Sequence, residues 1–141
     1  LYSMLALKDA LNSGFDEALI LDVDNNVNEG SGENFFMVKD DILYTPKDHT
    51  VLNGITRQTI IDISKDLDLE VFEKDISVED VKVADEAFFT GTAAEVTPVV
   101  QVDQSKIGGG TTGKITRKVQ KEYFDLIRGK NTKYDHWLTR V

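Results

Sequence analysis

Apolar residues follow two different periods along this chain. Short apolar or alternating runs bounded by glycine, asparagine, aspartate or proline are typical of strands, and they fall at 18–23, 27–29, 34–39, 42–45, 69–76, 86–90 and 96–102. A spacing of three and four residues, which places apolar side chains on one side of a helix, occurs at 1–13, 55–67 and 115–127. The pattern therefore predicts an α/β or α+β fold with a mixed sheet.

Turn and capping residues define several of the element ends. The pair Asp40-Asp41 predicts a hairpin between the strands that flank it. Asn53 is the expected N-cap of helix 55–67, and the segment 77–80 is a capping-box signal for a short helix. The glycines that are expected to end helices or to form a flexible loop are Gly14, Gly129 and those within 108–113.

Length and composition narrow the possible functions. A chain of 141 residues suits one domain with a single core, which we place at 1–141. The net charge of −9 argues against a nucleic-acid partner, because phosphate binding needs a basic surface. The chain has no cysteine, and its two histidines, His49 and His136, lie far apart, with His49 expected in a solvated loop. No apolar run is long enough to span a bilayer and no signal peptide is visible, so we expect a cytoplasmic protein.

Three connections rich in small residues are candidates for chemistry. The segment 29–34 combines two glycines with the carboxylates of Glu29 and Glu33. Residues 53–56 stand at a predicted helix start, where free amides bind anions. Residues 91–94 follow a predicted strand, and their small side chains leave backbone amides open to a ligand. Each connection alone could be an ordinary turn or cap, but together they suggest a ligand with one anionic and one protonated group.

These residues resemble a known family. The segments 29–36, 43–45 and 52–57 are similar to the signature of the class IV pyridoxal-phosphate aminotransferases. Residues 89–99 and the aromatic tail at 134–138 resemble the branched-chain amino acid aminotransferases in particular. The D-amino acid aminotransferases and aminodeoxychorismate lyases share the fold but usually lack such a tail. The resemblance covers essentially the whole chain and implies the large, cofactor-binding domain, a mixed sheet or pseudo-barrel with flanking helices.

The resemblance also implies roles for individual residues toward pyridoxal 5′-phosphate. Glu29 matches the acid that pairs with the pyridine nitrogen, and Leu52 matches the residue that packs on the ring. The phosphate site is matched by Ile55, Thr56 and Thr92. The substrate-carboxylate site is matched by Thr92, Ala93 and Ala94. The pocket wall is matched by Gly32, Asn34, Gly54 and Gly91. We assign no chemistry to Glu33 and Arg57, which we expect to be structural, with Arg57 pairing on the surface.

The implied activity is the transfer of an amino group between leucine, isoleucine or valine and 2-oxoglutarate. Its partners would be small amino and 2-oxo acids, and the protein would be a homodimer or a larger homo-oligomer. D-amino acid transfer and aminodeoxychorismate lysis are alternatives within the same fold. A non-catalytic domain that binds an anion or a protein partner is the alternative from another class.

The family's Schiff-base lysine has no equivalent within 1–141. Its matching position lies a few residues before Leu1, and Lys8 belongs to the following helix. The small N-terminal domain, which supplies an arginine to the phosphate, is also not matched. We therefore expect the chain to be incomplete at its N-terminus and inactive alone, because transamination needs a lysine amine to hold the aldehyde and to move a proton.

The first prediction is that the purified 141-residue chain has no transaminase activity and forms no covalent link to pyridoxal phosphate. Amino transfer from leucine to 2-oxoglutarate should stay at the level of a protein-free control. A stoichiometric cofactor absorbance that survives gel filtration, together with borohydride trapping at one lysine, would contradict this prediction.

Overall fold

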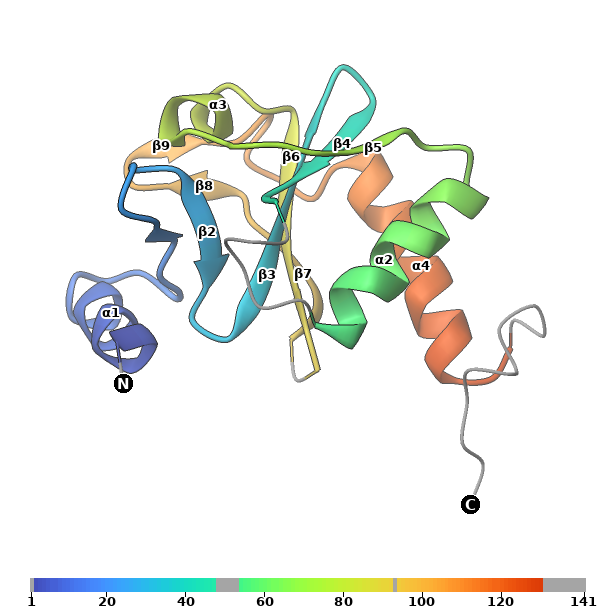
Figure 1. Ribbon diagram of the computed structural model, residues 1–141, viewed down its shortest axis with the longest axis horizontal. Helices are drawn as coiled ribbons and strands as arrows, with labels where there is room; N and C mark the ends of the chain where they lie inside the picture. The colour runs from blue at the N-terminus through green and yellow to red at the C-terminus, as the bar shows by residue number, and fades with distance from the viewer. Residues whose placement is uncertain (1, 48–53, 93, 131–141) are drawn as a thin grey trace.

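The computed structural model describes residues 2–47, 54–92 and 94–130 (Figure 1). The predicted alternation of helices and strands is confirmed in outline. The elements are α1 (Tyr2–Asn12), β1 (Ile20–Leu21), β2 (Val27–Gly30), β3 (Glu33–Lys39), β4 (Ile42–Thr45), α2 (Ile55–Asp66), β5 (Val71–Glu73), α3 (Val78–Lys82), β6 (Glu86–Gly91), β7 (Glu95–Pro98), β8 (Gln101–Val102), β9 (Ser105–Lys106) and α4 (Lys114–Ile127).

Strand β3 lies at the centre of a seven-stranded sheet. Along one edge β3 pairs with β6, and β7 pairs in turn with β6. The other edge of β3 is divided, because β2 pairs with its first half and β4 with its second half. Strand β5 runs parallel to β4, whereas the other paired strands of this sheet are antiparallel. The predicted mixed sheet of an α/β fold is therefore confirmed.

A buried hydrogen bond stabilises the point on β3 at which pairing changes from β2 to β4. The Thr45 hydroxyl donates to the Phe35 carbonyl oxygen at 2.8 Å, and both residues are fully buried. After β5 the chain returns to β2, where the Val27 amide donates to the Ile76 carbonyl oxygen at 2.7 Å. The sheet therefore curves toward closure, as the expected pseudo-barrel requires.

The two faces of the sheet are covered differently. Figure 1 shows α2 and α4 together over one face, with α3 and the β8–β9 hairpin on the other. Successive side chains of a strand point to opposite faces, so Phe36 packs toward α2 and α4, whereas Phe35 packs toward α3. Phe36 stacks on Phe88 of β6 with ring centroids 5.2 Å apart. Burial on both faces explains why β3 reads as a continuous apolar run.

Several local predictions are confirmed. Asp40 and Asp41 both have positive φ, at 51° and 63°, as a tight two-residue hairpin turn requires. Ser77 and Asp80 form the complete capping box at the start of α3. Ile60 and Ile63 of α2 are fully buried in the core between that helix and the sheet.

Other predictions are wrong. The strand predicted at 18–23 ends at Leu21, because the Asp22 carboxylate accepts hydrogen bonds from the amides of Asp24 and Asn26, both at 2.9 Å, and begins a turn. The strand predicted at 69–76 is reduced to β5. The extended stretch predicted at 96–102 is divided between β7 and β8, and β8 forms a separate hairpin with β9.

The N-cap of α2 is Gly54 rather than Asn53. Gly54 has extended backbone angles (φ −76°, ψ 150°), and its carbonyl oxygen accepts from the Gln58 amide at 3.2 Å. As a glycine, this N-cap residue has no side chain that could accept a hydrogen bond from the first amides of the helix. Asn53, His49, His136 and the aromatic tail at 134–138 lie outside the described residues.

Helix α4, by contrast, is capped by a side chain from the sheet. The buried Glu86 carboxylate accepts from the amides of Ile115 at 3.2 Å and Thr116 at 2.8 Å. These bonds satisfy free amides of the first turn and place a negative charge at the positive end of the helix dipole. A Cβ at Gly113 would overlap the Glu86 carboxyl group. The predicted flexible loop is therefore closely packed at this glycine.

The second prediction concerns Gly113. Gly113→Ala should lower the free energy of unfolding by about 2–4 kcal/mol, since the added methyl group displaces a carboxylate that makes two charge-assisted hydrogen bonds. Gly109→Ala is the matched control, because a Cβ there meets nothing within 4 Å, and its effect should stay within about 0.5 kcal/mol. Urea unfolding measures both. Equal effects of the two substitutions would show that Glu86 does not need the glycine.

Candidate functional site

Gly30, the last residue of β2, and Gly32, in the turn that follows, serve different purposes. Gly32 has a φ of +96°, which disfavours residues with a side chain. A Cβ at Gly30 would lie 2.9 Å from Cε1 of Phe89, so Gly30 lets β2 pack against that ring. The turn therefore depends on one glycine for its backbone angle and on the other for a close approach.

A row of polar side chains crosses three adjacent strands beside this turn. Glu29 of β2 stands opposite Asn34 of β3, and Asn34 stands opposite Thr90 of β6. Residues directly opposite in antiparallel strands share a face of the sheet. Glu29 is half-buried, Asn34 is 7% exposed and Thr90 is fully buried. Among the described residues, the Thr90 hydroxyl has no hydrogen-bond partner.

Helix α2 begins next to this row. A Cβ at Gly54 would lie 3.0 Å from Oδ1 of Asn34, so glycine lets the helix start close to that amide. Ile55 and Thr56 are the first two residues of the helix, and their amides lack partners within it. Ile55 is 89% exposed, and Thr56 is half-buried. The structure thus brings together a carboxylate, an amide side chain and a helix start whose N-cap is a glycine.

The third connection reaches the same segment from β6. A Cβ at Gly91 would lie 3.4 Å from both Cγ of Glu33 and the carbonyl oxygen of Gly32. Thr92 follows and is exposed, while Ala94 is half-buried. The second and third connections therefore both approach residues 32–34 of the first. Two other predicted site residues, Leu52 and Ala93, lie outside the described part of the chain.

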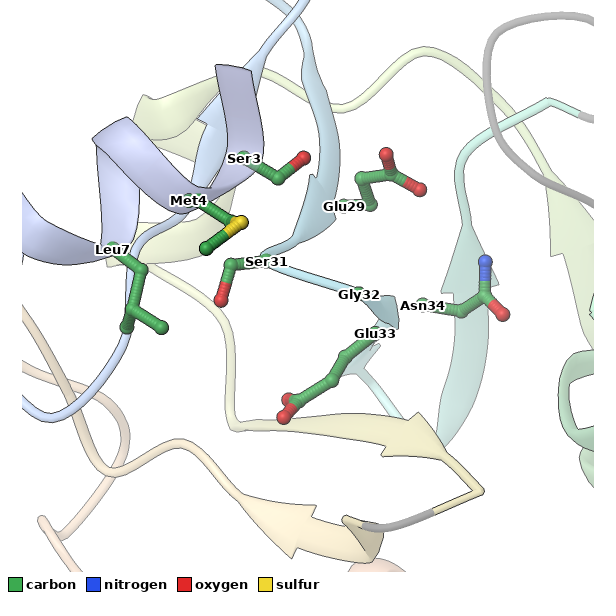
Figure 2. Close-up of a pocket in the computed structure, with 8 residues that line it drawn as sticks. All are labelled: Ser3, Met4, Leu7, Glu29, Ser31, Gly32, Glu33 and Asn34. Atoms are coloured by element: carbon green, nitrogen blue, oxygen red, sulfur yellow. The ribbon is translucent and has the colours of Figure 1, made fainter. Parts of the chain in front are cut away.

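A pocket of about 380 Å³ lies between α1 and the β2–β3 turn (Figure 2). In Figure 2 the side chains of Glu29 and Asn34 extend to one side of the turn, whereas Glu33 points away from both. The pocket volume is at the lower end of the range for small-molecule sites. The residues that line it are Ser3, Met4, Leu7, Glu29, Ser31, Gly32, Glu33 and Asn34.

A further carboxylate, Glu17, which the sequence did not indicate, contacts the turn. Glu17 accepts hydrogen bonds from the Ser31 hydroxyl and from the Ser31 amide, the latter at 3.2 Å. Burial, and then the negative charge of Glu17, raise the pKa of Glu33 above its ordinary value. The Glu17 carboxylate therefore holds the turn through Ser31, while ionisation of the Glu33 carboxyl group is disfavoured.

The structure corrects the expectation for one residue, Arg57, and adds another residue, Thr90, to the candidate site. The surface pairing expected for Arg57 is wrong, because its side chain is fully buried and pairs with Glu73. Thr90, a strand residue without a predicted role, belongs to the polar row. Because side chains alternate between the two faces of a strand, the sequence could place Thr90 on the same face as Phe88. Its pairing with Asn34 depends instead on which strands become neighbours.

Some other kinds of site find no support in the described ranges. Those residues contain no group of three or more histidines, aspartates or glutamates placed to hold a metal ion. No helix within the same ranges is long and apolar enough to cross a membrane.

Comparisons with known proteins agree on one family. The family model described as amino-transferase class IV matches residues 1–102. The chain is 52% identical over 139 residues to a branched-chain-amino-acid aminotransferase of Pseudomonas aeruginosa, and the match covers 99% of this chain and 45% of that protein. A branched-chain-amino-acid aminotransferase of Escherichia coli K12 is 42% identical over 142 residues, covering 100% of this chain and 46% of that protein.

Solved structures give the same result. The branched-chain aminotransferase of the thermophilic archaeon Thermoproteus uzoniensis, solved with norvaline, matches with a TM-score of 0.93 and 43% identity over 97% of this chain and 46% of that one. The enzyme of the same kind from Thermobaculum terrenum, in its PLP form, matches with a TM-score of 0.94 and 37% identity over 97% of this chain and 45% of that one. The chain thus spans less than half the length of these relatives.

The third prediction follows from the raised pKa of Glu33. Its native carboxyl holds a proton to higher pH than in the unfolded chain, so its favourable contribution is complete below the ordinary value of 4.5 and is lost as pH rises through the raised value. Glu33→Gln should therefore make the 141-residue chain more stable than wild type at neutral pH, by a margin that shrinks toward acid.

Urea unfolding at a series of pH values, from below the ordinary value of 4.5 up to neutral pH, measures this margin. Glu79→Gln, at an exposed position of α3, is the control. A margin that did not grow with pH would contradict the burial of the Glu33 charge.

Proposed function

This chain belongs to the class IV aminotransferases, and on that premise we propose that the intact protein is a branched-chain amino acid aminotransferase that uses pyridoxal 5′-phosphate. The observation that carries the proposal is that Glu29, Asn34 and the glycine-capped start of α2 lie together. We assign residues 1–141 to its cofactor-binding domain.

The residues present fit this cofactor. Pyridoxal phosphate has a basic ring nitrogen at one end and a phosphate at the other. The site offers a half-buried carboxylate at Glu29 and, next to Asn34, a helix start whose N-cap is a glycine. A helix start without a cap suits a phosphate, because its amides and its dipole both favour an anion.

Glu29 would act at the ring nitrogen. Bound pyridoxal phosphate supplies a ring that accepts electrons from the substrate Cα. The Glu29 carboxylate would hold a proton on the ring nitrogen, because a nearby negative charge favours the protonated form of a base. Leu52, by resemblance, would pack against one face of the ring.

The amides of Ile55 and Thr56 and the hydroxyl of Thr92 would hold the phosphate. The support for this assignment is that α2 starts beside Asn34, while Gly91 brings the chain before Thr92 against residues 32 and 33. The backbone of Thr92, Ala93 and Ala94 would hold the substrate carboxylate. Gly32, Gly54 and Gly91 would leave the space that these contacts need.

The substrate class comes from the relatives. Leucine, isoleucine or valine would give its amino group to 2-oxoglutarate, in agreement with the names of the relatives at 42–52% identity. As part of the same proposal, the intact protein would be a homodimer or a larger homo-oligomer in the cytoplasm.

The full-length protein tests the proposal. It should bind pyridoxal phosphate stoichiometrically and form glutamate from 2-oxoglutarate when leucine, isoleucine or valine is supplied. Transfer from D-alanine alone, or pyruvate release from aminodeoxychorismate, would assign it to one of the other two activities of this fold. Phosphate binding without any amino transfer would instead support a non-catalytic anion-binding domain.

The fourth prediction is that Glu29→Gln in the full-length protein slows amino transfer more than it affects folding. The lost charge-assisted hydrogen bond to the ring nitrogen is worth about 1.5–3 kcal/mol, or a rate loss of about ten- to a hundredfold. Single-turnover kinetics and thermal unfolding of the apo-protein separate the two effects. Asp24→Asn, at an exposed turn near β2, is the control and should leave both unchanged. Wild-type turnover in Glu29→Gln would make Glu29 an ordinary turn residue.

A further inference from the structure

The buried arginine of α2 stands in an electrostatically unfavourable place. Arg57 is the third residue of the helix, and its side chain is fully buried. A helix start already carries partial positive charge, so a cation there is repelled by the dipole and is also removed from water. A residue in this position needs strong partners, and a hydrophobic side chain would fill the volume at lower cost.

The partners of Arg57 tie the start of α2 to two strand ends. Its Nη2 donates to the Pro46 carbonyl oxygen and to Oε1 of Glu73, both at 2.9 Å. Pro46 directly follows β4, and Glu73 is the last residue of β5. Because β4 and β5 are parallel neighbours, one guanidinium group holds the first turn of α2 against the same end of both strands.

The same turn carries the amides assigned above to the phosphate. Arg57 comes immediately after Ile55 and Thr56, so an anchor at Arg57 fixes the direction of both amides. Pro46 and Arg57 also stand on either side of the chain segment that carries Leu52. The N-cap residue Gly54 makes no side-chain hydrogen bond, whereas the side chain of Arg57 anchors the first turn of the helix.

We propose that Arg57 is a positioning residue for phosphate recognition, which aims the first amides of α2 through its bonds to Pro46 and Glu73. The proposal rests on the proposed function, because it assigns the anchor of a phosphate site. Arginine suits the task because its planar group bonds two acceptors in a fixed geometry, which a lysine ammonium does not reproduce.

The experiment measures affinities for pyridoxal phosphate and for pyridoxal, which lacks the phosphate, in the full-length apo-protein by calorimetry. The ratio of the two affinities isolates phosphate recognition. Wild type should prefer pyridoxal phosphate strongly. Arg57→Met should lower the ratio by about fivefold or more, as expected from misdirecting at least one hydrogen bond, and Arg57→Lys should recover part of it. Affinity for pyridoxal should stay near wild type.

Two further variants separate positioning from other effects. Glu73→Leu removes one anchor of Arg57 and should lower the ratio, whereas Glu73→Gln keeps an oxygen acceptor and should lower it less. Lys65→Met removes the same charge from the exposed, C-terminal end of the same helix and should leave the ratio unchanged. Circular dichroism and thermal unfolding confirm that each variant is folded at the temperature of measurement.

The outcomes distinguish the two proposals. If wild type binds pyridoxal and pyridoxal phosphate equally, the proposed function fails. If wild type prefers the phosphate but a folded Arg57→Met keeps the wild-type ratio, the positioning role is overturned while the proposed function stands. Should Arg57→Met not fold, Arg57→Lys and Glu73→Leu decide in the same way, since an unchanged ratio in both overturns the role.

Discussion

The divided edge of β3 is the constraint on which the rest of the structure depends. One strand pairs with β2 over its first residues and with β4 over its last, and the Thr45 hydroxyl satisfies the Phe35 carbonyl oxygen where they part. That bond gives a buried carbonyl oxygen a partner where the two strands separate. Strands β4 and β5 continue the sheet beyond this division, and in the sequence β4 is followed by α2.

The candidate site is a consequence of this division. Ligands of α/β proteins bind where neighbouring strands diverge, because the connections there leave an opening that side chains do not fill. Asn34 lies on the first half of β3, opposite Glu29 on one edge and Thr90 on the other. Gly54 and Gly91 lack a Cβ where the chain approaches residues 32–34. Three connections far apart in sequence can therefore share one small region.

Helices α2 and α4, which cover the same face of the sheet (Figure 1), begin in different electrostatic surroundings. The partial positive charge at the start of α4 is neutralised by the Glu86 carboxylate, which accepts hydrogen bonds from two of the first amides of that helix. The N-cap of α2 is Gly54, which makes no side-chain hydrogen bond, and the buried Arg57 lies in the first turn of this helix. The first amides of α4 are thus already bonded to a carboxylate of the protein, whereas the N-cap residue of α2 provides no such acceptor. This difference is the reason for proposing the phosphate site at α2 and not at α4.

The sequence by itself determined most features that depend on near neighbours in the chain. The apolar periods of α2 and α4, the capping box at Ser77 and the Asp40-Asp41 turn act over a few residues, and each is found as predicted. The motif at 29–36 indicated the family because its glycines and acids lie close together in the sequence. Only the tertiary structure decided that Thr90 faces Asn34, that Glu17 holds the turn before Glu33, and that Arg57 is buried. These facts follow from which strands become neighbours and from how much water is removed around each charge. Both depend on contacts between distant parts of the chain, which local patterns do not encode.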